Sequence, residues 1–156
     1  MPKVSFSHVP RVKLSDRRGI GFLISDDGRF DAVTKFNSLR DNKARWVRSI
    51  MDHWVDGHDR PPWWFHGFDE EEFKACFVFK WDEHRAGQRL YGFKCHPKPQ
   101  SDKGFLLCVL VFHDQKTDKV DYGILREINN LRRDLQVIEA VGVQYKEFRG
   151  TYKWPH

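Results

Sequence analysis

Three apolar runs in the middle of the chain constrain its fold more than any other feature. They span residues 77–81, 90–95 and 105–112, and Gly, Pro and charged residues separate them. Short runs rich in β-branched and aromatic side chains, bounded by turn residues, are typical of β-strands. The sequence therefore predicts a three-stranded meander at the centre of the protein.

Cations, phenols and imidazoles occur within these strands and just beyond them. Lysine and arginine bind phosphate oxygens, while tyrosine and histidine add hydrogen-bonding groups. A meander that carries such side chains on one face is suited to bind a polyanion. The residues concerned are Lys80, His84, Arg85, Arg89, Tyr91, Lys94, His96, His113, Lys116, Lys119 and Tyr122.

Helical patterns flank the meander on both sides. Residues 31–56 carry apolar side chains at three- and four-residue spacing, which predicts a helical pair with Asp41 capping its second helix. Gly57 is expected to end that helix. A further helix is expected to begin at Asp118 or Asp121.

Strands are predicted at residues 20–25 and 136–148, while residues 1–19 suit an arm or an edge strand. The whole order predicts an α+β fold. In it, an N-terminal helical pair packs on a small antiparallel sheet, and an additional helix and strand follow at the C-terminus. We expect residues 1–30 to be the arm and first strand, and residues 31–156 to be one domain with its core in 31–135.

Composition limits the function classes. The net charge of +5 favours an acidic partner such as nucleic acid or an acidic protein. Cys76, Cys95 and Cys108 lack CxxC spacing, which indicates reduced thiols in the cytoplasm. We expect no membrane span, no metal site and no cofactor, because no apolar run is long enough and no histidine or cysteine pair has ligand spacing.

Several short motifs occur in an order that resembles the RelE/ParE superfamily of toxins from type II toxin–antitoxin systems, including its HigB-like branch. The resemblance covers residues 31–135. It depends on residues 65–68, on Lys80 closing a strand, on residues 88–91, and on an apolar strand followed by a basic loop and Tyr122. Lysines stand where that family often has arginine after its fourth strand.

The resemblance implies a metal-independent endoribonuclease that cleaves ribosome-associated mRNA and inhibits translation. Such a toxin is held inactive by a cognate antitoxin. It implies catalytic roles for Lys80 as base, Arg89 on the phosphate, Tyr122 at the 2′-OH and Lys116 as a further cation. It also implies RNA-binding roles for Arg85, Tyr91, Lys94 and Lys119.

Two alternatives remain open from the sequence. One is a ParE-like inhibitor of a protein target such as DNA gyrase, and the other is a phage-type nucleic-acid-binding module. The cluster at residues 63–65 is either a stacking platform for bases or part of the core. An antitoxin segment is expected to extend the sheet along the predicted strand at residues 136–148.

Overall fold

The computed structural model describes residues 2–96, 105–115 and 119–151, and of residues 144–151 it describes the backbone only. In chain order the elements are β1 (Val4–His8), β2 (Arg18–Ser25), α1 (Ala32–Asn37), α2 (Asp41–Val55), β3 (Phe65–Gly67), the 3-10 helix η1 (Glu71–Phe73), β4 (Cys76–Glu83), β5 (Ala86–Cys95), β6 (Leu106–Gln115), α3 (Tyr122–Arg132) and α4 (Leu135–Thr151).

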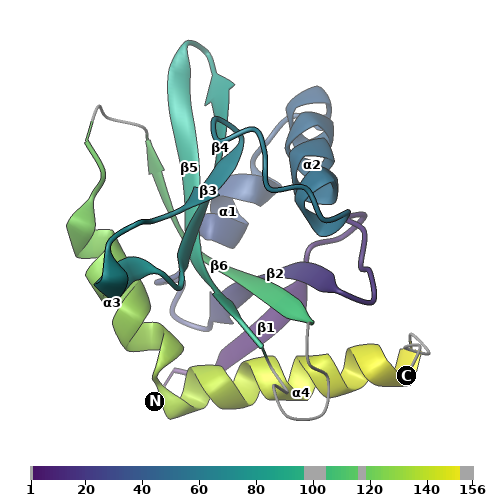
Figure 1. Ribbon diagram of the computed structural model, residues 1–156. Coiled ribbons are helices and arrows are strands. Elements are labelled where there is room, and N and C mark those ends of the chain that lie inside the picture. Colours follow the sequence, from purple (N-terminus) through teal and green to yellow (C-terminus); the bar gives the residue numbers. More distant parts are fainter. Residues whose placement is uncertain (1, 97–104, 116–118, 152–156) are drawn as a thin grey trace.

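The strands in the described part of the chain form one six-stranded mixed sheet with the order β1-β2-β6-β5-β4-β3. The pair β2–β6 is parallel, and every other pair is antiparallel. The hairpin of β4 and β5 extends beyond the helices at the top of Figure 1. Because β2 and β6 are distant in the sequence, their pairing is a non-local contact.

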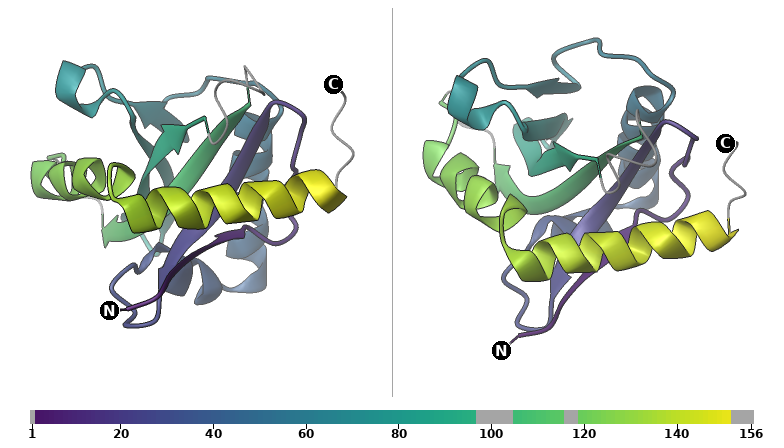
Figure 2. Two further views of the ribbon diagram at one scale, coloured as in Figure 1. Left: turned by 90° about the horizontal axis from the view of Figure 1, so that it is seen from below. Right: turned by 60° about the horizontal axis from the view of Figure 1, so that its bottom comes forward.

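Helices cover both faces of this sheet (Figures 1 and 2). On one face, α1 and α2 bury Phe36, Ile50 and Trp54 against β2, β4 and β6. On the other face, α3 packs on β4 and β5, and α4 crosses β1. Strands that are apolar on both faces need two layers of cover, and β2 is buried along nearly its whole length.

The predicted fold class is therefore wrong. The sheet is mixed rather than antiparallel, it is larger than expected, and the helical pair covers only one of its faces. The cause lies in β1 and β2, which precede the helical pair and extend the sheet through the parallel pairing of β2 with β6. A window of local sequence does not encode that pairing.

The predicted C-terminal strand at residues 136–148 is also wrong, because this segment belongs to α4. The carboxylate of Asp134 accepts hydrogen bonds from the backbone N–H groups of Gln136 at 2.8 Å and Val137 at 3.4 Å, and so caps the helix. Val137 and Val141, four residues apart, are buried, whereas Val143 is exposed. The buried valines follow the helical period, and a partner cannot extend the sheet there.

Asp41 is the first residue of α2 and not its cap, because Arg40 occupies the N-cap position without a side-chain hydrogen bond. Several other elements match their predictions. The three apolar runs form β4, β5 and β6. Asp121 caps α3 through a hydrogen bond from the N–H of Ile124 to its side chain. Gly57 follows α2 with a φ of 104°, a conformation in which glycine has no steric cost. No helix of the described chain has the length and apolar character needed to cross a membrane.

Candidate functional site

Polar side chains occupy two adjacent rows across one face of the sheet. The Cα pairing of β4, β5 and β6 sets Lys80 beside Arg89 and Arg89 beside Asp114. The next row holds His66, Val78, Tyr91 and Phe112. Residues two apart in a strand share a face, so His66 and Tyr91 lie on the same face as the first row. We call His66, Lys80, Arg89, Tyr91 and Asp114 the polar rows.

The polar rows lie on the face that α3 covers only in part. Val78 and Tyr91 belong to the core that packs against Leu125 and Ile128 of α3. Lys80 and Arg89 are one step further toward the tip of the β4–β5 hairpin, which rises above α3 in Figure 1. Lys80 and Asp114 are accordingly only half-buried. The site is at the boundary between packed sheet and solvent.

Arg89 is the most unusual member of the polar rows. Only 8% of its surface is exposed, and its Nη1 donates a 2.9 Å hydrogen bond to the hydroxyl of Tyr91. Within the described part of the chain, its Nε has no hydrogen-bond partner and the side chain makes no ion pair. A buried cation with an unsatisfied donor is costly, and an anionic ligand would relieve that cost.

His66 is the member of the polar rows that could act as a general base. Its Nδ1 lies 2.6 Å from the carbonyl oxygen of Gly67. A carbonyl only accepts, so Nδ1 carries the proton and the neutral ring keeps its lone pair on Nε2. Burial lowers the pKa of His66 below its usual value, and the charges of Lys80 and Arg89 lower it further, against the opposing effect of the Gly67 hydrogen bond. A neutral imidazole at neutral pH is a competent base.

Tyr91 and Tyr122 have different environments. Tyr91 is fully buried, and burial raises the pKa of its phenol, while the hydrogen bond from Arg89 opposes that shift. Tyr122 is 43% exposed at the start of α3, where its hydroxyl donates to the carboxylate of Glu70 at 2.9 Å and its ring packs on Phe73. The Glu70 hydrogen bond raises the pKa of Tyr122. Tyr122 is thus held toward η1.

The remaining predicted site residues are dispersed. Arg85 is exposed at the tip of the β4–β5 hairpin, and Lys119 is exposed ahead of α3. Lys94 lies on the opposite face of the sheet, where its Nζ is 4.9 Å from the centre of the Phe77 ring. Lys116 lies outside the described residues. The structure therefore gathers Lys80, Arg89 and Tyr91, and separates Lys94 from them.

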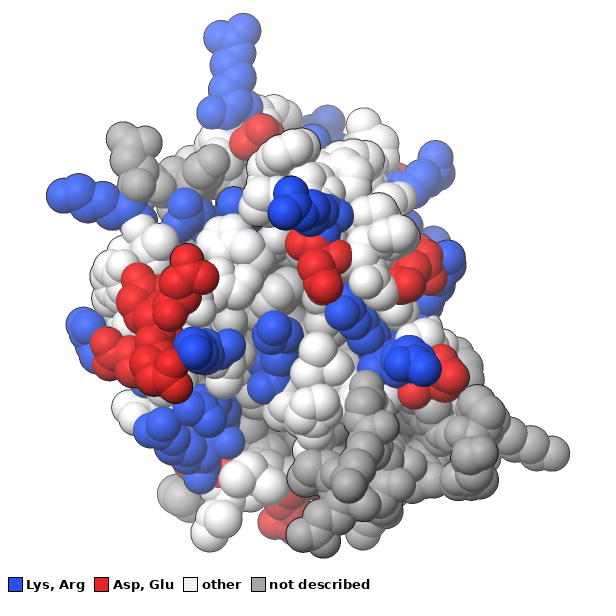
Figure 3. All heavy atoms as spheres, viewed as in Figure 1, with Lys and Arg blue, Asp and Glu red and all other residues white. Residues whose placement is uncertain are grey.

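Charge on the face seen in Figure 3 is mixed rather than uniformly basic. Figure 3 shows basic side chains distributed over this view and a group of acidic side chains at its left, on the side where η1 lies. The sequence there runs Asp69-Glu70-Glu71-Glu72. Asp114 adds a carboxylate within the polar rows. A polyanion would therefore be attracted to particular side chains and not to a broad basic surface.

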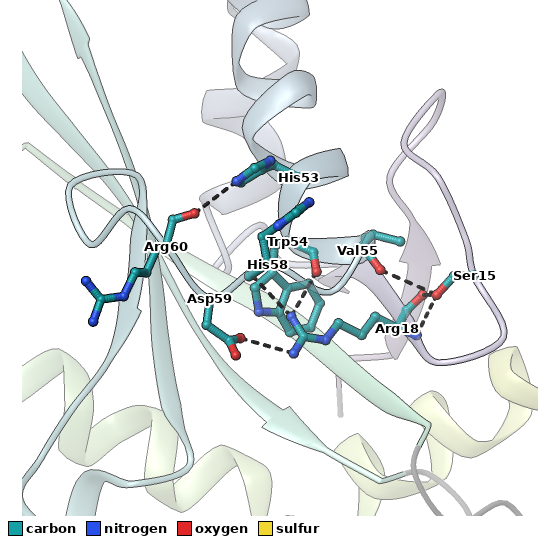
Figure 4. Close-up of polar contacts among 8 residues, drawn as sticks. All are labelled: Ser15, Arg18, His53, Trp54, Val55, His58, Asp59 and Arg60. Carbon is teal, nitrogen blue, oxygen red and sulfur yellow. Dashed lines mark hydrogen bonds and ion pairs between the residues drawn. The ribbon is translucent and has the colours of Figure 1, made fainter.

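A second polar cluster, at the end of α2, is structural (Figure 4). Arg18 donates to the carbonyl oxygens of Trp54 at 2.9 Å and His58 at 3.4 Å, and pairs with Asp59 at 3.1 Å. His53 and His58 stack with ring centres 4.0 Å apart, and the Nε2 of His53 is 2.9 Å from the carbonyl of Arg60. Arg18 and His53 both have partners within this cluster, so its role is to fix the chain segment that follows α2.

Among the described residues, no group of three or more histidine, cysteine and carboxylate side chains is placed to hold a metal ion. Cys76 and Cys108 are buried, free thiols. Burial raises the pKa of Cys76 to about 11, which disfavours the thiolate needed for nucleophilic attack. The polar rows offer imidazole, ammonium, guanidinium, phenol and carboxylate groups.

Sequence reasoning named the cations of this site and missed two of its members. His66 follows Phe65 in a short strand, and the available signal was the change from an apolar Phe65 to a polar His66. Asp114 ends the apolar run of β6, where its polarity marks the end of the buried segment. Asp114 becomes a neighbour of Arg89, and His66 joins the polar rows two strands away, only once the strand order is known.

Comparisons of the chain with models of protein families, with curated proteins and with solved structures gave no match.

Proposed function

We propose that this protein is an endoribonuclease that cleaves RNA through attack of a ribose 2′-OH on the adjacent phosphate. The observation that carries the proposal is Arg89, a buried guanidinium whose Nε lacks a partner within the described residues. A phosphate, like a carboxylate, is bound by a guanidinium with two parallel hydrogen bonds. His66, with a free lone pair on Nε2, and Lys80 complete an acid–base set on the same face.

Each group has a defined role in this reaction. Nε2 of His66 accepts the 2′-OH proton as the 2′ oxygen forms its bond to phosphorus. Arg89 stabilises the negative charge that builds on the non-bridging oxygens. The ammonium of Lys80 gives a proton to the 5′ oxygen as its bond to phosphorus breaks. The products are a 2′,3′-cyclic phosphate and a free 5′-OH, with His66 protonated and Lys80 neutral until they exchange protons with water.

The wider role that fits this chemistry is that of a toxin in a type II toxin–antitoxin system, with ribosome-associated mRNA as its substrate. An antitoxin would inhibit it by covering Lys80 and Arg89. Such a partner would place an acidic side chain against Arg89, because a buried cation gains most from a charged acceptor. Co-expression with the protein encoded by a neighbouring gene, followed by size-exclusion chromatography, tests for a complex.

The chemistry is tested by the ends of the cleavage products. RNA incubated with the purified protein and ribosomes should acquire 2′,3′-cyclic phosphate ends, and a 2′-deoxy nucleotide at the cleavage position should abolish the cut. Cleavage of free RNA, where it occurs, should survive EDTA, because no step uses a metal. The Lys80→Ala variant should cut more slowly by about 10²-fold. Ends with a 3′-OH would rule out the 2′-OH as nucleophile.

The pH profile tests the role of His66. Burial lowers the pKa of His66 below its usual value, so the basic form grows as pH rises through that lowered value and predominates at pH 7. Cleavage should therefore increase with pH below 6.5 and reach a plateau near neutrality. In the His66→Gln variant the slow residual rate should lose this dependence. An unchanged profile in His66→Gln would exclude the imidazole as the base.

A further inference from the structure

A pocket of about 250 Å³ lies at the outer edge of β4, between α2 and the turn that precedes β3. Tryptophan dominates its wall, and three charged residues lie around it. The lining residues are Lys43, Trp46, Trp63, Trp64, Lys80, Trp81 and Asp82. Lys80 contributes both to this pocket and to the polar rows, so the two meet at the edge of β4, although α2 and Trp81 lie on the face of the sheet opposite the polar rows.

The pocket has one fixed wall and one exposed wall. Trp64 is half-buried, and its backbone is fixed at both ends. Its backbone N–H donates to the carbonyl of Pro61, and its carbonyl accepts from the backbone N–H of Lys80 at 2.8 Å. Trp46 packs edge-on against Trp64, with ring centres 5.4 Å apart. Trp63, by contrast, is 69% exposed, and Trp46 is 43% exposed. Two large indole surfaces are therefore available to a ligand beside a rigid third.

The charges around the pocket complement a nucleotide. Lys43 donates from Nζ to the backbone carbonyl of Asp82 at 2.8 Å, which holds its ammonium beside the indoles. An ammonium has three N–H groups, so two remain for a phosphate. The exposed carboxylate of Asp82 accepts hydrogen bonds only, and the N–H groups on the edge of a nucleobase are suitable donors.

We propose that this pocket binds one unpaired nucleotide of single-stranded RNA. The base stacks on Trp63 and Trp46, its N–H edge faces Asp82, and a phosphate contacts Lys43. Unpaired bases stack on aromatic side chains whereas paired bases are inaccessible to them. The proposal rests on the proposed function for its placement beside the cleavage site through Lys80, but binding itself does not require cleavage.

Binding is measured with a fluorescently labelled RNA octamer in which every ribose is 2′-O-methylated, because this RNA cannot be cut by a 2′-OH. Trp63→Ala should weaken its binding by about 5- to 100-fold, the range expected for the loss of one stacked base. Lys43→Ala should weaken binding and reduce the dependence on salt by about one phosphate contact. A duplex of the same sequence should compete poorly.

Matched controls remove similar side chains elsewhere. Leu135→Ala deletes another exposed apolar side chain, 81% exposed on α4, and Lys74→Ala deletes an exposed lysine paired with Glu71. Both should bind the octamer as the parent does. Circular dichroism should show that Trp63→Ala, an exposed substitution, keeps the fold.

The outcomes separate this inference from the proposed function. If the parent binds the octamer through Trp63 but cuts no RNA, the pocket stands and the endoribonuclease proposal fails. If the parent cuts RNA while Trp63→Ala binds the octamer with unchanged affinity, the pocket proposal is overturned and the cleavage site stands. A parent protein that binds a protein partner through Trp63 but no single-stranded RNA would also overturn it.

Discussion

Two arginines on opposite faces of the sheet show how differently this fold treats a buried cation. The side chain of Arg18 is 18% exposed, and Arg89 as a residue is 8% exposed. Arg18 has two carbonyl acceptors, a carboxylate and an indole ring 4.7 Å from its guanidinium carbon (Figure 4). Arg89 has one neutral hydroxyl. Arg18 is thus fully compensated by the protein, whereas Arg89 among the described residues has a single neutral acceptor, which is why we propose that it binds a ligand.

The cause is the position of each side chain relative to a helix end. Arg18 contacts the C-terminal turn of α2, whose carbonyl groups carry the negative end of the helix dipole. The residues after that turn supply Asp59. Arg89 instead lies between strands, beyond the area that α3 covers, with Tyr91 as its acceptor. Its charge is therefore compensated less by the protein itself.

The largest predicted effect concerns the proposed catalytic role of Arg89. Arg89→Met removes the guanidinium and keeps much of its volume, so RNA cleavage should fall by about 10²–10³-fold. The free energy of unfolding should stay the same or rise, since replacing an incompletely paired buried charge by an apolar side chain is often neutral or stabilising. Urea denaturation and a cleavage assay measure the two effects. A variant that unfolds easily would place Arg89 with Arg18 among the structural residues.

Arg18→Met should show the opposite behaviour. It deletes three hydrogen bonds from a charged donor and a cation–π contact, and stability should fall by about 2–3 kcal/mol. Cleavage per folded molecule should remain. Lys13→Ala, which removes an exposed pair with Asp56 at the same helix end, is the matched control and should change stability little. Equal losses in both variants would contradict the structural role of Arg18.

A smaller effect is expected at Tyr91, the acceptor of Arg89. Tyr91→Phe leaves the buried guanidinium without that hydrogen bond, and stability should fall by about 1–2 kcal/mol. In the Arg89→Met background the same substitution should cost much less, because no donor remains to be satisfied. A double-mutant cycle from urea denaturation measures the difference. Additive losses would show that the hydroxyl of Tyr91 contributes independently of Arg89.

Local signals in the sequence predicted part of the fold. The hairpin of β4 and β5 follows from apolar runs separated by charged residues, and α3 follows from Asp121 and the spacing of Leu125, Ile128 and Leu131. The parallel pairing of β2 with β6 joins segments that are far apart, so no local pattern contains it. The error at α4 came from the wrong period, since Val137 and Val141 are four residues apart.

The residues of the candidate site likewise divide into those that local sequence brings together and those that depend on non-local contacts. Lys80 and Arg89 become neighbours as soon as the β4–β5 hairpin forms, and the sequence named both. His66 and Asp114 join them only through the order of β6, β5, β4 and β3, which depends on non-local contacts. The exposure of Trp63 and the burial of Phe65, two residues apart in the chain, depend on the turn between α2 and β3.

The smallest predicted effect concerns a third arginine, Arg85, in the two-residue turn of the β4–β5 hairpin. His84 and Arg85 have φ values of 51° and 65°, and Glu83 pairs with Ala86 across the turn. A left-handed conformation costs a residue with a Cβ roughly 1–2 kcal/mol, and glycine avoids that cost while losing more chain entropy. Arg85→Gly should therefore raise stability by roughly 0.5–1 kcal/mol.

Arg85→Ala is the matched control, because it removes the charge but keeps the Cβ and its strain. If Arg85 contacts RNA as predicted from the sequence, both variants should lose about the same affinity for the methylated octamer, and Arg85→Gly alone should gain stability. If neither variant loses affinity, Arg85 is only a turn residue, and the RNA contacts of the hairpin end at Arg89. If Arg85→Gly is less stable than the parent, a contact of the guanidinium stabilises the turn by more than the backbone strain costs.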